Sequence, residues 1–278
     1  MSLKLIYITN IPSVALIAEK NGVDRIMVDL ETLGKEERQK NMNTVKSHHT
    51  VDDVRIISNM LTSSEMLVRV NPWNETSVNE IEAVIAAGAD RIMLPMWKTT
   101  KEVNSFLHTV NGRVHTTLLL ETREAAEIID EILENPLIDE IHIGLNDLHL
   151  SFGLTFMFEL LSNGVVERLC QKCKAKGIPY GFGGIARIGE GTLPAESIVM
   201  EHYRLGSSRV ILSRSFCNTD QITDIASVET IFSENMTLLR AYETSLADKT
   251  DLDYSDNIKA VKRNVNMIVK KIKEKKVQ

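Results

Sequence analysis

The 278-residue chain has few of the features that mark secreted or membrane proteins. It contains only three cysteines, and the pair Cys170 and Cys173 lies in one helix-like segment without the second pair or histidine partner that a zinc site needs. No stretch of about 18 apolar residues could span a bilayer, and the N-terminus shows no charged leader followed by an apolar run and a cleavage site. These absences predict a cytoplasmic protein with reduced thiols.

A basic surface is also missing. The net charge is −6, and both signs are spread along the chain except in the Lys-rich last turns. No nucleic-acid or membrane partner is therefore expected, and a small molecule is the predicted ligand. With 43% hydrophobic residues, the chain is long and apolar enough to form a large buried core.

Short β-branched segments alternate with helix-length amphipathic segments along the chain. Eight strand-like segments occur in the order LKLIYIT, DRIMVDL, EMLVRV, DRIMLP, HTTLLLE, DEIHIGL, IPYGFGG and SRVILS. Such alternation requires parallel strands with crossover helices, and segments apolar on both faces are typical of a sheet covered on both sides. Eight repeats favour a closed (β/α)8 TIM barrel. A doubly wound sheet is the alternative, but the first strand-to-helix turn, TNIPS, lacks the usual glycine-rich phosphate-binding sequence.

The barrel is predicted over residues 1–220, and residues 221–278 form a C-terminal helical extension. One apolar face of this extension repeats at three-four spacing through Ile258, Val261, Val265, Ile268 and Ile272. The face packs either on the chain's own barrel or on a neighbouring subunit. Because it is too regular and too long to be left in water, we expect a homo-oligomer.

Polar residues stand at the carboxyl ends of the predicted strands, where the loops of a barrel form its active site. They are Asp29, Glu31, Arg69, Asn71, Glu121, Asn146, Asp147, Ser213 and Arg214. Carboxylate oxygens suit Mg²⁺ or Mn²⁺, which take one or two such ligands and leave other positions to water and substrate. An arginine beside the cation could bind a substrate carboxylate with two hydrogen bonds. The alternative is a ring of ion pairs that closes the barrel without chemistry.

The same segments resemble the HpcH/HpaI aldolase and citrate lyase β-subunit family of metal-dependent barrels. The resemblance covers roughly residues 20–155, and its motifs are IMVDLET, LVRVN, AGADRIMLPM, LLLETREAAEIIDEI and IDEIHIGLNDLHLSFG, in that order. It implies an enzyme that binds pyruvate or an acetyl thioester as an enolate on a divalent metal and makes or breaks a C–C bond to an aldehyde or keto partner. A trimer or hexamer is the assembly that the resemblance suggests.

By this resemblance Glu121 in LLLET and Asp147 in GLNDL are the metal ligands. Arg69 in VRVN binds the substrate carboxylate and polarises its carbonyl. The segment from Gly144 through Asn146 to Asp147 supplies backbone N–H groups to the same carboxylate.

The acidic pair Asp29 and Glu31 also matches the family, but the next residue departs from it. Thr32 stands where the aldolase branch has a histidine that helps proton transfer. Leu119 stands where that branch often has glutamine, which is more similar to the citrate lyase branch. Another group must therefore transfer protons, or the reaction is that of an acyl-CoA lyase.

Several groups could replace the missing histidine as acid or base. His149 follows Asp147 by two residues, Glu31 precedes Thr32, and His48 and His49 lie in a long loop that could fold over the barrel mouth. A metal-bound water with a lowered pKa is a further alternative. His142, inside the sixth strand, is expected to be a core or interhelical residue.

Two further features have both a functional and a packing interpretation. The run Gly181–Arg187, with Arg214, could bind a phosphate or CoA, although glycines after a strand also permit a tight turn, which we favour. Trp73 and Trp97 could wall the substrate pocket or pack between loops.

Three functions fit these observations. The first is a class II, metal-dependent C–C lyase acting on a 2-oxo or hydroxy acid. The second is a citrate-lyase-β-like or malyl-CoA-like acyl lyase. The third is a non-catalytic carboxylate-binding barrel that has lost its base.

Overall fold

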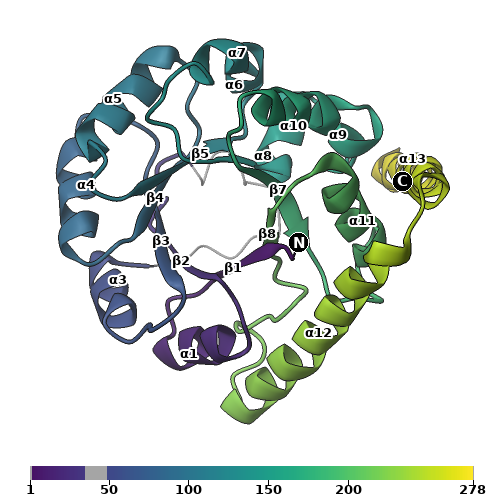
Figure 1. The fold of residues 1–278 in the computed structure, drawn as a ribbon, viewed down its shortest axis with the longest axis horizontal. Helices are drawn as coiled ribbons and strands as arrows, with labels where there is room; N and C mark the ends of the chain where they lie inside the picture. The colour runs from purple at the N-terminus through teal and green to yellow at the C-terminus, as the bar shows by residue number, and fades with distance from the viewer. Residues whose placement is uncertain (1, 35–48, 278) are drawn as a thin grey trace.

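Eight parallel strands form a closed barrel in the computed structural model, which describes residues 2–34 and 49–277 (Figure 1). The strands are β1 (Lys4–Ile8), β2 (Arg25–Asp29), β3 (Glu65–Arg69), β4 (Arg91–Leu94), β5 (His115–Leu120), β6 (Ile141–Ile143), β7 (Tyr180–Ile185) and β8 (Arg209–Leu212). Each strand pairs with the next, and β8 pairs with β1. The predicted (β/α)8 TIM barrel is confirmed, and the doubly wound alternative is wrong.

Helices surround the barrel on its outside (Figure 1). They are α1 (Pro12–Lys20), α3 (Val51–Ser58), α4 (Ser77–Ala86), α5 (Thr100–Val110), α6 (Arg123–Glu127), α7 (Ile129–Ile132), α8 (Leu145–Ser151), α9 (Glu159–Ser162), α10 (Val165–Ala175), α11 (Ala195–Leu205), α12 (Ile225–Ser245) and α13 (Asp251–Val277). Thr50 and Thr99 begin α3 and α5 with capping boxes, which fix where these helices start relative to the preceding loops. None of the helices within residues 2–34 and 49–277 combines the length and apolarity needed to cross a bilayer.

The inside of the barrel is filled in layers, because alternate residues of each strand face its axis. The middle layer is an apolar cluster that is separate from the main core between strands and helices. Its buried members are Ile6, Met27, Leu67, Met93 and Leu119. This layer separates two charged regions, one at each end of the barrel.

Buried ion pairs close the amino-terminal end of the barrel. Arg25 at the start of β2 contacts Glu140 at 2.8 Å and Glu65 at 2.6 Å. Arg209 at the start of β8 contacts Glu140 at 3.1 Å, and Arg91 at the start of β4 contacts Glu65 at 3.3 Å. We call these five side chains the basal network. It differs from the ion-pair ring considered as an alternative from the sequence, because that ring would consist of the residues at the opposite, carboxyl end of the strands.

The two C-terminal helices pack on the barrel of the same chain (Figure 1). Helix α12 contacts α1, and α13 contacts α9 and α11. Val261 and Val265 of the predicted apolar face are buried there, and Asn257 donates hydrogen bonds to Ser197 O and Glu201 Oε1. Of the two alternatives for this face, the chain's own barrel is therefore the observed partner. Ile258, Ile268 and Ile272 of the same face are half-buried, so this packing covers the face only in part.

Candidate active site

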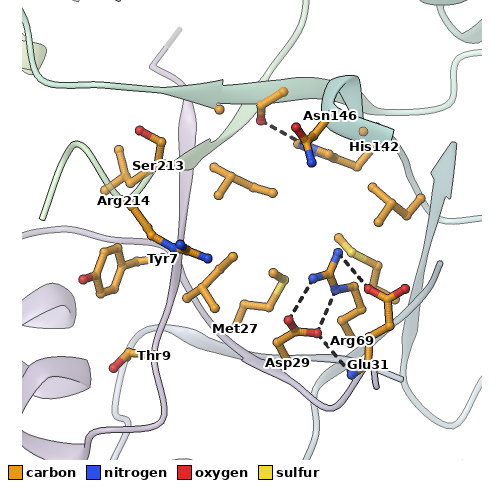
Figure 2. Close-up of a pocket in the computed structure, with 18 of the residues that line it drawn as sticks. Tyr7, Thr9, Met27, Asp29, Glu31, Arg69, His142, Asn146, Ser213 and Arg214 are labelled. Atoms are coloured by element: carbon orange, nitrogen blue, oxygen red, sulfur yellow. Dashed lines mark hydrogen bonds and ion pairs between the residues drawn. The ribbon is translucent and has the colours of Figure 1, made fainter. Parts of the chain in front are cut away.

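A cavity of about 510 Å³ opens at the carboxyl ends of the strands. Eight of the nine strand-end polar residues singled out from the sequence line it, and Asn71 does not. The residues that line it are Asp29, Glu31, Arg69, Glu121, Asn146, Asp147, Ser213 and Arg214, with Gly144 beside them. Figure 2 shows six of these side chains around the cavity. The strand ends therefore converge as the barrel prediction required.

Arg69 is held rigidly by the two acidic residues that follow β2. Its Nε and one terminal nitrogen donate to the two carboxylate oxygens of Asp29 at 2.9 and 2.8 Å, and its other terminal nitrogen lies 3.4 Å from Glu31 (Figure 2). These charges raise the pKa of Arg69 far above its ordinary value, against the opposing and largest effect of burial. A guanidinium has five N–H groups, so Arg69 can hold Asp29 and still donate to a substrate.

Glu121 lies buried at the end of β5 and faces Asp147 across the site. Burial raises the pKa of Glu121 well above its ordinary value, the charge of Asp147 raises it further, and Arg69 opposes the shift. Its Oε1 accepts a hydrogen bond of 3.1 Å from the Met96 N–H. Met96 adopts a left-handed backbone with φ of 54°, a strained conformation for a residue with a side chain and one that occurs often at functional sites. Two carboxylates thus meet in a place that disfavours the charge of Glu121.

The donors at this place fit a hard divalent cation. Two carboxylates are what magnesium commonly takes from a protein, and a cation between them would relieve their repulsion. Gly144 leaves room beside them, because a Cβ there would come within 2.9 Å of Glu121 Oε2. In the part of the chain that the structure describes, no three His, Cys, Asp or Glu side chains group into a metal site. The remaining ligands would then be water and substrate oxygens.

The backbone before α8 differs in one respect from the expectation. The Gly144 N–H donates to Leu120 O at 2.9 Å, so the strand ladder uses it and it cannot bind a substrate carboxylate. Gly144 therefore contributes space rather than a hydrogen bond. Asn146 and Asp147 lie in the first turn of α8, where N–H groups have no partner within the helix.

The two histidines of the β6 region, His142 and His149, differ from the sequence-based expectation in which of them lines the cavity. His149 is buried in α8 with Nδ1 3.2 Å from Leu145 O, and it is not among the residues that line the cavity. Because His149 packs within the helix and does not line the cavity, it is not placed to transfer protons there. His142 is buried inside the barrel as predicted, yet it also lines the cavity floor, with Nε2 3.2 Å from Gly183 O (Figure 2).

Thr32, at the position where a proton-transferring histidine was expected from the resemblance, does not line the cavity. It is exposed, and its N–H and hydroxyl both donate to Asn71 Oδ1, at 2.9 and 3.3 Å. Asn71 in turn donates to Glu80 Oε1 at 2.8 Å. Asn71 therefore organises the loop after β2 instead of lining the cavity.

His49 reaches the cavity from the loop before α3. Its Nδ1 accepts a hydrogen bond of 2.9 Å from the Asp29 N–H, next to Arg69 and Glu31. Because Nδ1 accepts, the neutral ring carries its proton on Nε2. The prediction that this loop brings a histidine to the mouth applies to His49, and its neighbour His48 lies outside the described residues.

The glycines of β7 serve the backbone. A register shift between Gly181 and Gly184 marks a bulge against β8, and Gly183 has a positive φ of 51° with Leu145 Cδ1 only 2.7 Å from where a Cβ would be. Arg187 lies outside the cavity, with Nε donating to Ser215 O at 3.1 Å.

The two tryptophans singled out from the sequence do not line the cavity. Trp97 is buried in the main core, and Trp73 is half-buried against the same core.

Solved structures similar to this chain share its barrel. An HpcH/HpaI aldolase from Desulfitobacterium hafniense DCB-2 has a TM-score of 0.61 at 14% identity, over 86% of this chain and 93% of that one. An HpcH/HpaI aldolase/citrate lyase family protein from Burkholderia cenocepacia J2315 has 0.59 at 15%, over 89% and 94%. Macrophomate synthase has 0.54 at 17%, over 76% and 78%. At such identities the likeness concerns the fold alone.

Sequence comparison gives the family directly. No curated protein shows a significant match to the chain. The family model described as HpcH/HpaI aldolase/citrate lyase matches residues 6–181, which is more than half of the chain and includes the ends of β2, β3, β5 and β6 that build the site. The chain therefore belongs to the HpcH/HpaI aldolase/citrate lyase family.

Proposed function

We propose that the protein is a metal-dependent C–C lyase of the class II aldolase type, which cleaves or forms a 2-oxo hydroxy acid through a pyruvate-like enolate. Membership of an aldolase and citrate lyase family supports the reaction class. The observation that carries the proposal is the pairing of Glu121 and Asp147 beside Arg69 in one cavity. A carboxylate pair and a fixed guanidinium suit a 2-oxo acid, because its carboxylate and carbonyl need both kinds of partner.

Glu121 and Asp147 would hold Mg²⁺ or Mn²⁺. The cation, when bound, supplies Lewis-acid stabilisation of negative charge that develops on the substrate carbonyl oxygen. Met96 keeps Glu121 in place through its N–H, so the carboxylate does not have to reorganise on binding. Preorganised groups of this kind contribute most to catalysis in a water-excluded site.

Arg69 would bind the substrate carboxylate and direct the carbonyl. Asp29 holds one edge of the guanidinium, which leaves the donors on the other side of the fork for the substrate. Asp29 is therefore a positioning residue in this proposal. The amides at the start of α8, around Asn146, lie on the same cavity and would contact the other carboxylate oxygen.

Glu31 would act as the base, and His49 would act as a hydrogen-bond donor. Glu31 is buried at the cavity wall, with its carboxylate 3.4 Å from Arg69, and would accept a proton from the substrate methyl group. His49, with its proton on Nε2, is a hydrogen-bond donor and would polarise the carbonyl of the second substrate rather than act as a base. This division replaces the histidine that the sequence lacks at Thr32.

The enolisation step can be tested without knowing the second substrate. Pyruvate incubated with the protein and Mn²⁺ in deuterium oxide should exchange its methyl protons, and a chelator should stop the exchange. A Glu82→Gln control, altered at the exposed surface pair with Arg113, should exchange at the unaltered rate. A protein that binds Mn²⁺ and pyruvate but catalyses no exchange would be the carboxylate-binding barrel instead.

One observation favours the acyl-lyase alternative. Leu119 lines the cavity below Glu121, where an apolar side chain offers no hydrogen bond to a hydroxylated substrate. A citrate-lyase-like or malyl-CoA-like reaction would depend on a thioester. Cleavage of a hydroxyacyl-CoA with no cleavage of the free acid would decide for that function.

The assembly remains a proposal. We propose a homo-oligomer, such as the trimer or hexamer that the family resemblance suggests, in the cytoplasm and without nucleic-acid or membrane partners. Light scattering of the intact chain tests it, and a monomer at all protein concentrations would contradict it.

A further inference from the structure

The cavity extends well beyond the region of Arg69. Its volume of about 510 Å³ is in the range of pockets that enclose drug-sized ligands, so a three-carbon oxo acid leaves much of it unfilled. The remainder lies between β1 and β8. The polar side chains that follow β1 and β8 and line the cavity are Thr9, Asn10, Ser213, Arg214, Asn218, Thr219 and Asp220.

Arg214 gives this second region its charge. Figure 2 shows its guanidinium extending into the cavity from the β8 side, opposite Arg69. Among the cavity-lining residues that the structure describes, Arg69 and Arg214 are the two with a permanent positive charge. Arg69 is surrounded by carboxylates, whereas Asp220 is the one carboxylate lining the β1–β8 side.

The walls near Arg214 are polar but mostly fixed. Tyr7 donates its hydroxyl to Cys217 O at 2.9 Å, and Ser213 shares a 2.7 Å hydrogen bond with Ser215. Gly184 of β7 also lines the cavity here, and a Cβ on it would meet Ile211 O at 3.1 Å. The ends of β7 and β8 are where barrels frequently bind phosphate, and a planar guanidinium matches phosphate oxygens.

We infer that Arg214, with Ser213 and the backbone at the ends of β7 and β8, binds a phosphate monoester on the second substrate. The inference rests on the proposed function and names that substrate as a phosphorylated aldehyde. The enolate carbon attacks the aldehyde carbon and forms the C–C bond. The electron pair of the aldehyde C=O moves to its oxygen, which takes up the proton given up by the methyl group. The phosphate is not transferred.

Matched aldehydes test the inference. In the presence of pyruvate and Mn²⁺, D-glyceraldehyde 3-phosphate should have a kcat/KM about tenfold or more above D-glyceraldehyde. Arg214→Gln should remove this preference, because its kcat/KM should fall about tenfold or more further for D-glyceraldehyde 3-phosphate than for D-glyceraldehyde. Arg187→Gln is the control, because Arg187 is a neighbouring arginine outside the cavity. A preference that survives in Arg214→Gln, or no preference in the unaltered protein, would overturn it.

Two further experiments distinguish a failure of this inference from a failure of the proposed function. Succinic semialdehyde against butanal tests a carboxylate in place of phosphate, and an equal or greater preference for the carboxylate refutes the phosphate assignment. Calorimetry with unreactive glycerol 3-phosphate needs no catalysis, and Arg214→Gln should bind it about tenfold more weakly than Arg187→Gln does. Lack of deuterium exchange would refute the proposed function, whereas lack of glycerol 3-phosphate binding would refute this inference alone.

Discussion

The two ends of the barrel both bury charged side chains, but in opposite proportions. At the amino-terminal end, three arginines meet two carboxylates, and Glu140 lies between Arg25 and Arg209. Burial lowers the pKa of Arg209, and Glu140 is the main group that opposes this effect. The basal network therefore consists of charges of opposite sign that depend on one another.

At the carboxyl-terminal end the carboxylates outnumber the arginine they surround. Asp29 and Glu31 pair with Arg69, while burial and then the charge of the facing Asp147 raise the pKa of Glu121. A buried charge that its own neighbours disfavour points to a missing cation, whereas a buried charge that its neighbours favour points to structure. The carboxyl-terminal end is therefore interpreted as the active site and the amino-terminal end as part of the structural framework. Replacing a carboxylate by its amide at each end tests this interpretation.

The largest effect is expected when a carboxylate is replaced by its amide at either end of the barrel. Glu121→Gln and Asp147→Asn should abolish Mn²⁺ binding and deuterium exchange, with a Tm in chelator close to that of the parent, because they remove a repulsive charge. Glu140→Gln should leave Mn²⁺ binding intact and lower the stability by about 3 kcal/mol, because it strands buried arginines. Calorimetry and thermal unfolding measure both. Unaltered Mn²⁺ binding in both site variants would refute the enolate mechanism.

The next effect distinguishes arginines at the two ends. Arg69→Lys keeps the charge but loses the planar fork that holds Asp29 and the substrate together, so kcat/KM for a 2-oxo acid should fall by about 100-fold. Arg91→Lys in the basal network should leave kcat/KM within about twofold. Steady-state kinetics of the two variants provide the measurement. An unchanged kcat/KM in Arg69→Lys would place Arg69 outside the substrate site.

A smaller effect is expected at His49. His49→Gln removes the imidazole donor beside Asp29 and should slow C–C bond formation with an aldehyde by about 10- to 100-fold, with pyruvate deuterium exchange less affected. Thr32→Val is the control at the position where the aldolase branch has its histidine, and its activity should stay near that of the parent because the Thr32 hydroxyl is exposed and donates to the loop residue Asn71. Equal losses in both variants would argue for a loop effect instead.

The barrel and its strand-end residues could be predicted because they follow from local pattern. Strand composition fixes the elements, and parallel strands bring their carboxyl ends together whatever the loops do. The basal network was missed although its signal is in the sequence, where Arg25, Arg91 and Arg209 each begin a strand. A charged residue that faces the axis at a strand start cannot reach solvent easily and needs a partner there.

The rest depends on tertiary placement that no local pattern contains. His49 was one histidine among several, and its role depends on how the loop before α3 returns to Asp29. His149 looked favourable two residues from Asp147, but two residues on a helix turn a side chain to another face. The apolar spacing of α13 predicted a face that needs a partner, and Val261 and Val265 of it are buried, but the spacing could not say whether the chain's own α9 and α11 or another subunit would cover it.

The smallest effect concerns the layer between the two ends. Burial lowers the pKa of His142 to about 4 from an ordinary value of 6.5, and the nearby Glu140 only partly opposes this. Because the folded-state pKa is depressed, the unfolded chain binds more protons between pH 6.5 and 4. The stability from keeping His142 neutral is therefore fully present above pH 6.5 and is lost as the pH falls through 4.

His142→Gln should flatten this dependence. The parent should lose up to about 1.4 kcal/mol per pH unit from this residue across that window, and the variant should lack that share of the slope. Urea unfolding at a series of pH values measures it, with His115→Gln, an exposed histidine at the start of β5, as the control that keeps the parent slope. If His142→Gln and His115→Gln have the same slope as the parent, the cavity floor is hydrated in solution, and the apolar layer does not insulate the active site from the basal network.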